Sequence, residues 1–521
     1  MPSACDRAAA PKPVDLKTWI GFIAMSFGML MAILDIQIVA SSLPEIQVGL
    51  HLPLAQLTWV QTAYLMAEIV AIPLTGWLTR VLSTRGAFVV GVAGFTAASV
   101  ACALSTGFWS LIPARVAQGF CGGLLIPLVF SAVFLIFPSA LRPRATAIAG
   151  AMAMLAPTLG PTVGGFITDR YSWHWLFLIN VGPGILVALL AALLVDCDRA
   201  ERGSLGSVDL WSLPPLAVFL GTLEVVLNEA PRRGWGDPLM LLLTLLCLGC
   251  GVWTIRRCLT HSRPLIELEC FRDRNFALGC GFSFALGLGL YGATYLLPVF
   301  LGVVRYYEAL DIGLIMIVTG AAQLAMAPLA AWLEPRVEAR VLLLAGYGLF
   351  AVGLIGNGFM TFATDFWGLF GQQLARGAAV MLCILPSTAL ALEALPAARV
   401  PNASGCFNLM RNLGGAIGLG LIDTIIQNRT PAHIKALVAR LQAGDPAAAR
   451  IVGLPTERFT GVPITHIDQA TRDVIAPLVR RAGLVAALND AWLFIGVLVL
   501  VSLLLLPLMR RTEPRDAQQL P

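Results

Sequence analysis

The sequence predicts an all-α integral membrane protein whose chain crosses the bilayer fourteen times. Hydrophobic residues make up 58% of the 521 residues and charged residues only 12%, whereas a soluble chain usually carries roughly 25% charged residues. Apolar stretches of about 20 residues, the length that a helix needs to cross the bilayer core, recur along the chain. Unbroken apolar runs such as 494–506 exclude the alternating pattern of a membrane β-barrel, so the spans are predicted to be helices.

The candidate spans are separated by short polar or proline-containing segments. The first span is longer than a signal-peptide core and lacks a small-residue cleavage site, so it is expected to be retained. The fourteen spans lie near residues 18–40, 56–78, 87–106, 111–136, 145–168, 175–195, 210–228, 238–256, 276–302, 311–332, 341–361, 366–394, 404–427 and 490–509.

Positive charge is distributed unevenly between the two sides of this topology. The tails and short loops on the N-terminal side hold 20 Lys and Arg residues, whereas the short loops on the other side hold four, Arg170, Arg232, Arg233 and Arg305. Because basic residues in short loops stay in the cytoplasm, both termini are predicted to be cytoplasmic. The net charge of +5 follows from this arrangement and gives no support to nucleic-acid binding.

The two halves of the chain share a pattern of marker residues. Arg115 opens one span and Pro127 follows it, while Arg376 opens another and Pro386 follows. Weak internal repeats are typical of secondary transporters, whose solute site lies between the repeats near the midplane. The predicted division is a cytoplasmic tail at 1–17, a six-helix bundle at 18–195, two inserted helices at 210–256, a second six-helix bundle at 276–509 and a cytoplasmic tail at 510–521.

The second bundle contains a long outer loop at 428–489. Its segments 432–447 and 468–488 are alanine-rich or carry apolar residues at roughly helical spacing. The sequence leaves two alternatives open for this loop. One is a folded external cap or docking surface, and the other is a solvated tether.

Several predicted spans contain ionisable side chains, and four of these side chains are the first candidates for a function. Asp35 lies in the first, Glu68 in the second, Arg115 in the fourth and Glu224 in the seventh. An ionisable group at the bilayer centre costs about 2.5–3.5 kcal/mol on insertion scales, so each is by default a functional hypothesis. The alternative for each is a structural role, with the side chain held by a partner inside the helix bundle.

Sequence motifs around these residues occur in a recognisable order. The first span ends LDIQIVASSLP at 34–44, the fourth begins RVAQGFCGG at 115–123, and the fifth contains GPTVGG at 160–165. WHW at 173–175 and FLINV at 177–181 follow. Together these motifs resemble those of the major facilitator superfamily, and more narrowly its fourteen-span drug:proton antiporters of the EmrB/QacA type.

The resemblance implies a major facilitator fold, with two six-helix bundles plus two inserted helices, and a role for particular residues. The aspartate at the position of Asp35 serves proton coupling in that family. Arg115 keeps its charge under ordinary conditions and can gate such a proton. Glu68 is a further candidate for proton coupling.

The glycine-rich motif of the fifth span is similar to the family's antiporter motif. Its members here are Gly160, Pro161, Gly164 and Gly165. Small residues four apart let helices approach closely, and proline after glycine is expected to kink the helix.

The chain also departs from the family pattern. Gln37 and Ala40 replace a Thr and an Asn in the first-span motif. In the loop after the second span, the family motif G-x-L-x-D-R-x-G-R-R joins the two halves through charge. Here Arg80 stands where the Asp belongs, and Ser83 replaces the second Gly.

These observations predict a proton-driven antiporter that exports hydrophobic or amphipathic small molecules across the inner membrane. Protonation of Asp35 is expected to neutralise a midplane cavity and to bias one of two states, open inward or outward. The polar residues expected along the solute path are Gln37, Gln61, Tyr64, Gln118, Glu224 and Arg411.

No P-loop pattern is present, so the proton motive force is the expected energy source, with no cofactor and no metal. The expected partners are protons, a small hydrophobic solute and membrane lipid. In a Gram-negative host the resemblance also implies a periplasmic adaptor protein and an outer-membrane channel. The open alternatives are an exporter dedicated to one metabolite, such as a siderophore or fatty acid, an uptake symporter, and an intramembrane enzyme or sensor.

Overall fold

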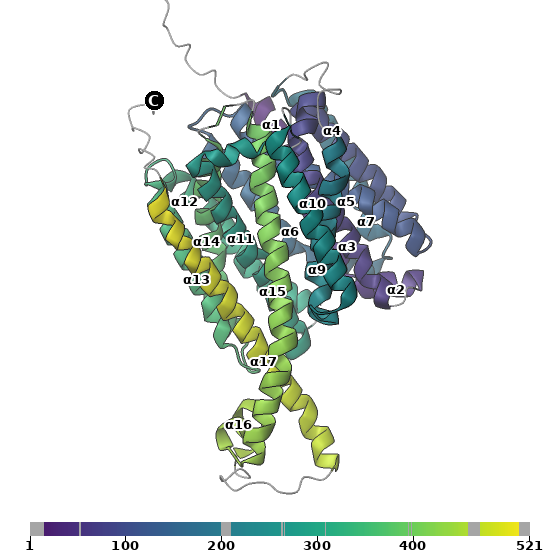
Figure 1. Ribbon diagram of the computed structural model, residues 1–521, viewed down its shortest axis with the longest axis vertical. Coiled ribbons are helices and arrows are strands. Elements are labelled where there is room, and N and C mark those ends of the chain that lie inside the picture. The colour runs from purple at the N-terminus through teal and green to yellow at the C-terminus, as the bar shows by residue number, and fades with distance from the viewer. Residues whose placement is uncertain are drawn as a thin grey trace, which may run out of the picture.

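The computed structural model describes residues 15–51, 54–198, 210–261, 264, 266–307, 309–393, 395–396, 399–456 and 469–509. Within these residues all regular structure is helical, and long aligned helices form one bundle from which a helical hairpin projects (Figure 1). The predicted tails, apart from 15–17, lie outside the described residues. We call the end of the bundle nearer to Leu16 and Met509 the terminal side, and the end that carries the projection the hairpin side.

The first six-helix bundle begins with α1 and ends with α8. Its second span consists of α3, a short 3-10 turn and the beginning of α4, because the helical backbone is broken at Ser83 inside α4. The elements are α1 (Leu16–Ser41), α2 (Leu43–Leu50), α3 (Leu54–Ala71), α4 (Thr75–Ala103), α5 (Phe108–Ile136), α6 (Arg142–Arg170), α7 (Trp175–Leu178) and α8 (Val181–Leu194).

The second bundle repeats the packing of the first. α1 packs on α6 and α3 on α5 in the first bundle, and α11 packs on α15 and α12 on α14 in the second. The elements of the second half are α11 (Arg274–Val299), α12 (Ala309–Leu333), α13 (Ala339–Gly356), α14 (Phe366–Leu392), α15 (Val400–Gln442), α16 (Pro446–Val452) and α17 (Gln469–Val501). The inserted pair is α9 (Leu213–Arg233) and α10 (Pro238–Thr260).

The helices account for the predicted number of membrane crossings. Twelve stretches of the described residues are long and apolar enough to cross a membrane, and one of them, Trp59–Ala103, holds both the second and the third crossing. α6 supplies the remaining crossing, and its many Gly, Ala and Thr residues keep its hydropathy low. The predicted all-α fold with fourteen crossings is confirmed.

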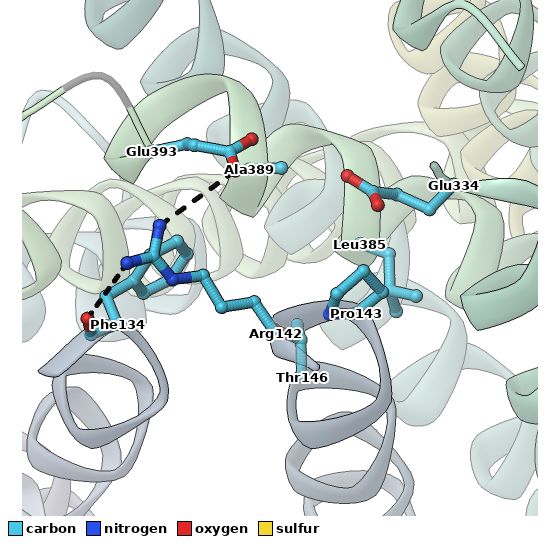
Figure 2. Close-up of a pocket in the computed structure, with 8 residues that line it drawn as sticks. All are labelled: Phe134, Arg142, Pro143, Thr146, Glu334, Leu385, Ala389 and Glu393. Carbon is cyan, nitrogen blue, oxygen red and sulfur yellow. Dashed lines mark hydrogen bonds and ion pairs between the residues drawn. The ribbon is translucent and has the colours of Figure 1, made fainter. Parts of the chain in front are cut away.

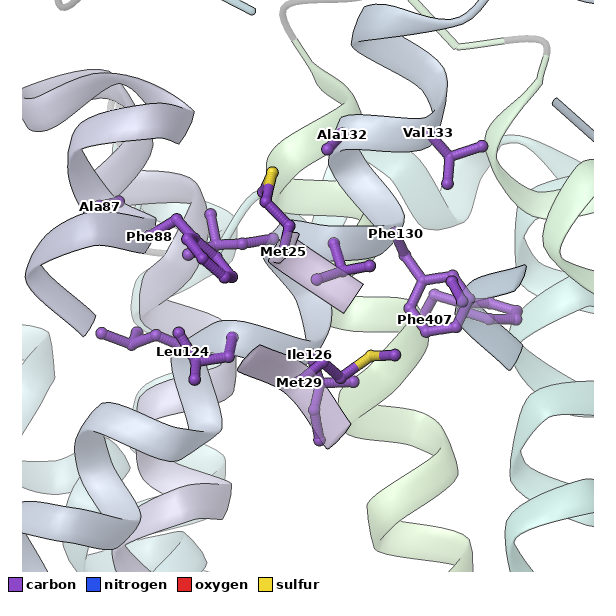
Figure 3. Packing of buried hydrophobic residues seen from close by; sticks show 14 of the residues in the cluster. Met25, Met29, Ala87, Phe88, Leu124, Ile126, Phe130, Ala132, Val133 and Phe407 are labelled. Carbon is purple, nitrogen blue, oxygen red and sulfur yellow. The ribbon is translucent and has the colours of Figure 1, made fainter. Parts of the chain in front are cut away.

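The apolar core of the first bundle continues into the second. Met25, Phe88 and Leu124 are buried together between α1, α4 and α5 (Figure 3). Phe130 of α5 and Phe407 of α15 belong to the same cluster, so the cluster crosses the boundary between the bundles. Because lipid and protein interior are equally apolar, close packing rather than the hydrophobic effect holds these helices together.

The bundles also touch at both ends. On the terminal side, a Cβ atom on Gly76 would lie 2.8 Å from Asn402 of α15, and the Ser404 hydroxyl donates to the Pro127 carbonyl at 2.9 Å. On the hairpin side, a Cβ on Gly313 of α12 would collide with the Thr162 side chain of α6. The two bundles therefore meet above and below the middle of the membrane.

An arginine closes the gap between α6 and the second bundle on the terminal side. Arg142 Nη1 lies 3.9 Å from Glu393 Oε1, and Arg142 Nη2 donates to the Phe134 carbonyl at 3.3 Å (Figure 2). The cavity that remains beside Pro143 and Leu385 measures about 10 Å³, which is room for about one water molecule.

In the loop that departs from the family motif, Arg80 forms an ion pair with an acidic residue outside that motif. Arg80 Nη1 lies 2.5 Å from Glu267 Oε1, and Glu267 belongs to the segment that joins the inserted helices to the second bundle. In the same segment Glu269 Oε2 lies 3.6 Å from Arg399 Nη2, and Arg399 immediately precedes α15. This segment therefore links α4 of the first bundle to α15 of the second.

The long outer loop is helical through its described part, which supports the folded alternative. α15 has 43 residues, about 65 Å at 1.5 Å per residue, so it extends well beyond a bilayer core of about 30 Å. Leu437, Leu441, Val452 and Val479 of α15, α16 and α17 form a small separate core. We call residues 428–489 the projecting hairpin, of which 457–468 lie outside the described residues.

Ser83 replaces the second glycine of the family's loop motif, and its backbone conformation explains why glycine is usual at this position. Its φ of 66° and ψ of 163° lie in a region used almost only by glycine, which costs another residue about 1–3 kcal/mol. Its hydroxyl accepts a hydrogen bond from the Gly86 N–H at 3.2 Å, and the Asp198 carboxylate caps the following helix by accepting from the Thr84 N–H at 2.8 Å.

We expect Ser83→Gly to stabilise the protein, because glycine adopts this conformation without strain. The melting temperature in detergent, followed by tryptophan fluorescence, should rise by roughly 1–3 °C. Ser83→Ala is the matched control: it keeps the strained Cβ and loses the hydroxyl bond, so its melting temperature should fall. A glycine variant that melts as low as the alanine variant would contradict the strain argument.

Candidate functional site

The two ionisable residues of the first and fourth spans form a buried ion pair. Arg115 Nη1 lies 2.6 Å from Asp35 Oδ2, and both side chains are completely inaccessible to solvent. A buried pair is stable only where further hydrogen bonds satisfy the remaining polar atoms. The surroundings supply hydrogen bonds to both carboxylate oxygens of Asp35, whereas Arg115 Nη2 has no hydrogen-bond partner among the described residues.

Three side chains donate to the Asp35 carboxylate. In addition to Arg115, the amide of Gln118 donates to Oδ1 at 2.9 Å and the amide of Asn180 donates to the same oxygen at 2.8 Å. Gln118 itself accepts from Arg115 at 2.7 Å and donates to the Ser99 hydroxyl at 2.8 Å. The charge of Asp35 is therefore distributed over a closed network from α1, α4, α5 and the turn before α8.

Arg115 is fixed by two further contacts with α3. Its Nε donates to the Val60 carbonyl at 3.0 Å, and its guanidinium carbon lies 4.5 Å above the centre of the Tyr64 ring. The Tyr64 hydroxyl donates to the Ala32 carbonyl of α1 at 3.0 Å. The ion pair thus joins α1, α3 and α5 at one point.

Part of this network was not predicted from the sequence. Asn180 stands in the FLINV motif, whose position was noted without a role, and Ser99 is one of several serines in apolar spans. The Val60 carbonyl left no signal in the sequence, because any residue provides a backbone carbonyl. Among the partners that were not predicted, Asn180 alone had a sequence signal, its polarity inside an apolar span.

A cavity of about 570 Å³ lies between the two bundles. This volume is within the range of pockets that enclose drug-sized molecules. Helices α1, α3, α5, α6 and α9 line one side, and α11, α12 and α15 line the other. Most of the lining is apolar, with a few polar side chains between the apolar ones.

The cavity includes some of the predicted residues and not others. Of the predicted solute path, Gln37, Gln61, Glu224 and Arg411 line the cavity, and so does Glu68. Tyr64 and Gln118 instead belong to the network around the ion pair.

Asp35 does not line the cavity, in contrast to the expectation that its protonation neutralises the cavity directly. The cavity-lining residues of α1 are Ile33, Ile36 and Gln37. Residues two apart on a helix point to nearly opposite sides, so Asp35 faces the interior of the first bundle while Gln37 faces the cavity. α1 separates the ion pair from the cavity.

The second bundle contributes polar groups to the cavity that the sequence had not singled out. The Tyr291 hydroxyl donates to Asn412 Oδ1 at 3.0 Å, and the Tyr295 hydroxyl donates to Asp423 Oδ1 at 2.7 Å. Tyr291, Tyr295 and Asn412 all line the cavity. Tyrosines in an apolar span were not a specific signal, because their rings are equally suited to packing.

The antiporter motif lies where α6 packs on α1. A Cβ atom on Gly160 would collide with the Cβ atom of Gln37 on α1, so the close approach of the two helices requires glycine at this position. Gly164 is buried and Gly165 half-buried in the same helix. The side chain of Pro161 lies outside the described part of the structure, and the helical backbone continues through its position.

The equivalent arginine of the second bundle has a different environment. Arg376 donates to Gln373 Oε1 and lies 5.3 Å from the centre of the Trp492 ring. No carboxylate pairs with Arg376 among the described residues, whereas Arg115 has Asp35. The described residues also hold no group of three metal-binding side chains.

Comparison with known proteins assigns the family. The sequence profile of the Major Facilitator Superfamily matches residues 25–419. The chain belongs to this superfamily. The predicted family is confirmed, and as its members are transporters, the protein is a multi-pass membrane transporter and not an enzyme.

Relatives within the superfamily narrow the group to EmrB-type proteins. The chain is 38% identical over 494 residues to the colistin resistance protein EmrB of Acinetobacter baumannii, which covers 95% of this chain and 96% of the relative. It is 31% identical over 487 residues to the multidrug export protein EmrB of Escherichia coli, covering 92% and 93%.

A solved structure supports the fold independently of sequence. The proton:xylose symporter XylE, bound to 6-bromo-6-deoxy-D-glucose, has a TM-score of 0.61 at 14% identity and covers 94% of each chain. At this identity the likeness shows the major facilitator fold alone.

We expect Arg115→Lys to reduce transport by roughly tenfold or more, although it keeps a positive charge. Lysine cannot reach Asp35, Gln118 and the Val60 carbonyl at once, because it lacks the planar fork of donors. Efflux from vesicles at matched protein levels, measured from mildly acidic to mildly alkaline pH, tests this.

The matched control is Arg336→Lys. Arg336 also lies 4.5 Å from an aromatic ring centre, that of Trp332, but it is outside the buried network, so its variant should transport normally. If Arg115→Lys follows the same pH profile as the control, Arg115 only fills space.

We also expect Gly160→Leu to abolish transport, because its side chain would push α6 away from Gln37 on α1. Gly249→Leu on α10 is the control, since no atom lies within 4 Å of a Cβ at that position. The measurement is efflux at equal membrane levels. Unimpaired efflux by Gly160→Leu would show that α6 and α1 need not stay in close contact.

Proposed function

We propose that this transporter exports hydrophobic or amphipathic small molecules in exchange for protons that enter the cell. The observation that carries the proposal is the position of the Asp35–Arg115 pair. It is buried on one face of α1, and the other face of the same helix lines the cavity. One rigid helix therefore connects a proton-binding group with a solute-binding space.

A proton on Asp35 acts by weakening the interactions that hold α1 in place. Ionised Asp35 accepts from Arg115, Gln118 and Asn180, and these bonds fix α1 against α5 and the turn before α8. Protonation removes the charge attraction, while Arg115 keeps its contacts with Val60 and Gln118. α1 is then free to shift against α3 and α5.

A shift of α1 reaches the cavity directly. Ile33, Ile36 and Gln37 move with the helix, and Gln37 lies against Gly160 of α6. The driving force is the membrane potential and proton gradient, where moving one charge through 100 mV is worth about 2.3 kcal/mol. No cofactor takes part in this scheme.

The solute class follows from the cavity lining. An apolar wall selects hydrophobic molecules by their contact area, and the few polar groups fix orientation rather than one chemical identity. The names of the EmrB-type relatives, one for multidrug export and one for colistin resistance, support solutes of this kind. An exporter dedicated to one metabolite would differ in transporting a single member of a panel of apolar solutes.

We further propose that the protein lies in the inner membrane with both termini in the cytoplasm. The excess of basic residues in the short loops of the terminal side supports this orientation. The projecting hairpin, which has its own small apolar core, then lies in the periplasm. There it is placed to contact a periplasmic adaptor that leads to an outer-membrane channel.

We expect Asp35→Asn to abolish proton-driven efflux while folded protein stays in the membrane. Asparagine keeps the size of the side chain but has no proton to exchange. The test is solute accumulation in energised inside-out vesicles, with Asp311→Asn as a control at an exposed site on α12. Efflux at the wild-type rate by Asp35→Asn would rule out its role, and solute movement with the proton would indicate an uptake symporter.

A further inference from the structure

Arg376 of α14 carries a buried charge that no carboxylate balances among the described residues. Arg376 is 5% exposed, and an arginine keeps its charge under ordinary conditions. Arg115 of the first bundle has the Asp35 carboxylate at 2.6 Å. Because a buried charge without a partner is costly, Arg376 requires a counter-charge from another source.

The side chains around Arg376 offer hydrogen-bond donors that lack an acceptor. Nε and Nη1 of Arg376, Nε2 of Gln373 and Nε1 of Trp492 are buried without a hydrogen-bond partner in the described part of the chain. Arg376 Nη2 donates to Gln373 Oε1, and the guanidinium carbon lies 5.3 Å from the centre of the Trp492 ring. Buried donors are normally satisfied, so these three neighbouring side chains share the need for one acceptor.

Helix α13 closes this site from a further direction. A Cβ atom on Gly353 of α13 would lie 2.6 Å from Arg376 Cγ, so α13 packs directly on the arginine. Asn357 follows four residues later, is 1% exposed, and its amide has no hydrogen-bond partner among the described residues. Unsatisfied polar groups therefore gather where α13, α14 and α17 meet.

Neither the cavity between the bundles nor the acid near Trp492 supplies the counter-charge. None of the described residues of α14 lines that cavity. Asp490, two residues before Trp492 on α17, is engaged by Arg429 at 2.9 Å and by His433 at 2.8 Å. Residues two apart on a helix point to nearly opposite sides, so Asp490 faces away from this site.

We infer that the second bundle binds a small monovalent inorganic anion, of which chloride is the type, between Arg376, Gln373 and Trp492. An anion supplies negative charge and accepts hydrogen bonds, whereas a water molecule supplies no charge. The anion would have the role that the Asp35 carboxylate has in the first bundle. Arg376 lies about 15 Å from the start of α14, so the anion enters from the hairpin side.

The test follows the melting temperature of the purified full-length protein in detergent. Gluconate is replaced by chloride at constant ionic strength, and unfolding is followed by tryptophan fluorescence. A ligand that binds only the folded state stabilises it. Chloride should therefore raise the melting temperature of the wild type by roughly 2–4 °C, and the rise should saturate. A melting temperature that does not depend on chloride would overturn the inference.

Gln373→Glu locates the ion. Gln373 Oε1 already accepts from Arg376, so a glutamate would supply the missing carboxylate in place of the anion. This variant should lose the chloride effect and should melt, without chloride, about as high as the wild type does with it. Gln372→Glu is the matched control, because Gln372 is half-buried on a neighbouring face of α14, and it should keep the effect. A wild-type chloride response in Gln373→Glu would show that the ion is not at Arg376.

Trp492→Phe gives a second, milder measurement. It keeps an aromatic ring and removes only the Nε1 donor, so the chloride concentration at half of the maximal rise should increase about tenfold. Trp367→Phe is the control, since Trp367 is 75% exposed near the start of α14. An unchanged concentration in Trp492→Phe would overturn the site as assigned. These measurements involve neither Asp35 nor the cavity, so their failure would leave proton-driven export standing.

Discussion

The buried pair of Asp35 and Arg115 is the constraint on which the first bundle depends. The bilayer core offers no water to a charged group, so each must find its partners inside the protein. Arg115 satisfies this need by reaching Asp35 on α1 and the Val60 carbonyl on α3 from its own helix α5. The arrangement of these three helices is therefore tied to one charge pair, and any change in that charge acts on all three.

The two bundles share their packing but not this charge pair. Arg115 and Arg376 occupy comparable positions, and each is held by a glutamine three residues away and by an aromatic ring. Only Arg115 has a carboxylate partner among the described residues. In the scheme proposed here, the first bundle responds to protons, and the second provides tyrosines and Arg411 to the cavity wall. The two bundles therefore share a fold while having different proposed roles in transport.

The sequence predicted the fold well because its signals are local. Span length, apolar composition and the Gly160–Gly165 motif are each visible in a short stretch of sequence, and the resemblance supplied the arrangement of the spans. The partners of Arg80 were not predictable, because Glu267 follows it by 187 positions and lies in a loop outside any motif. Tyr64 and Gln118 were placed in the solute path because periodicity identifies the polar residues of a helix but not which neighbour each one faces.

Ser83 and Glu267 show how a departure from the family pattern can be compensated nearby. The family motif places an acid where this chain has Arg80, so a partner of opposite charge is required, and Glu267 supplies it at 2.5 Å. Glu267 and Glu269 lie on the connector that follows the inserted helices, while Glu224 lies on the first of those helices. The inserted pair and its connector therefore contact both bundles at two places: α9 contacts α3 and α15 beside the cavity, and the connector contacts Arg80 and Arg399 at the terminal side. A segment with both contacts cannot act as a neutral spacer, because movement of either bundle changes its contacts at the cavity wall and at the connector together.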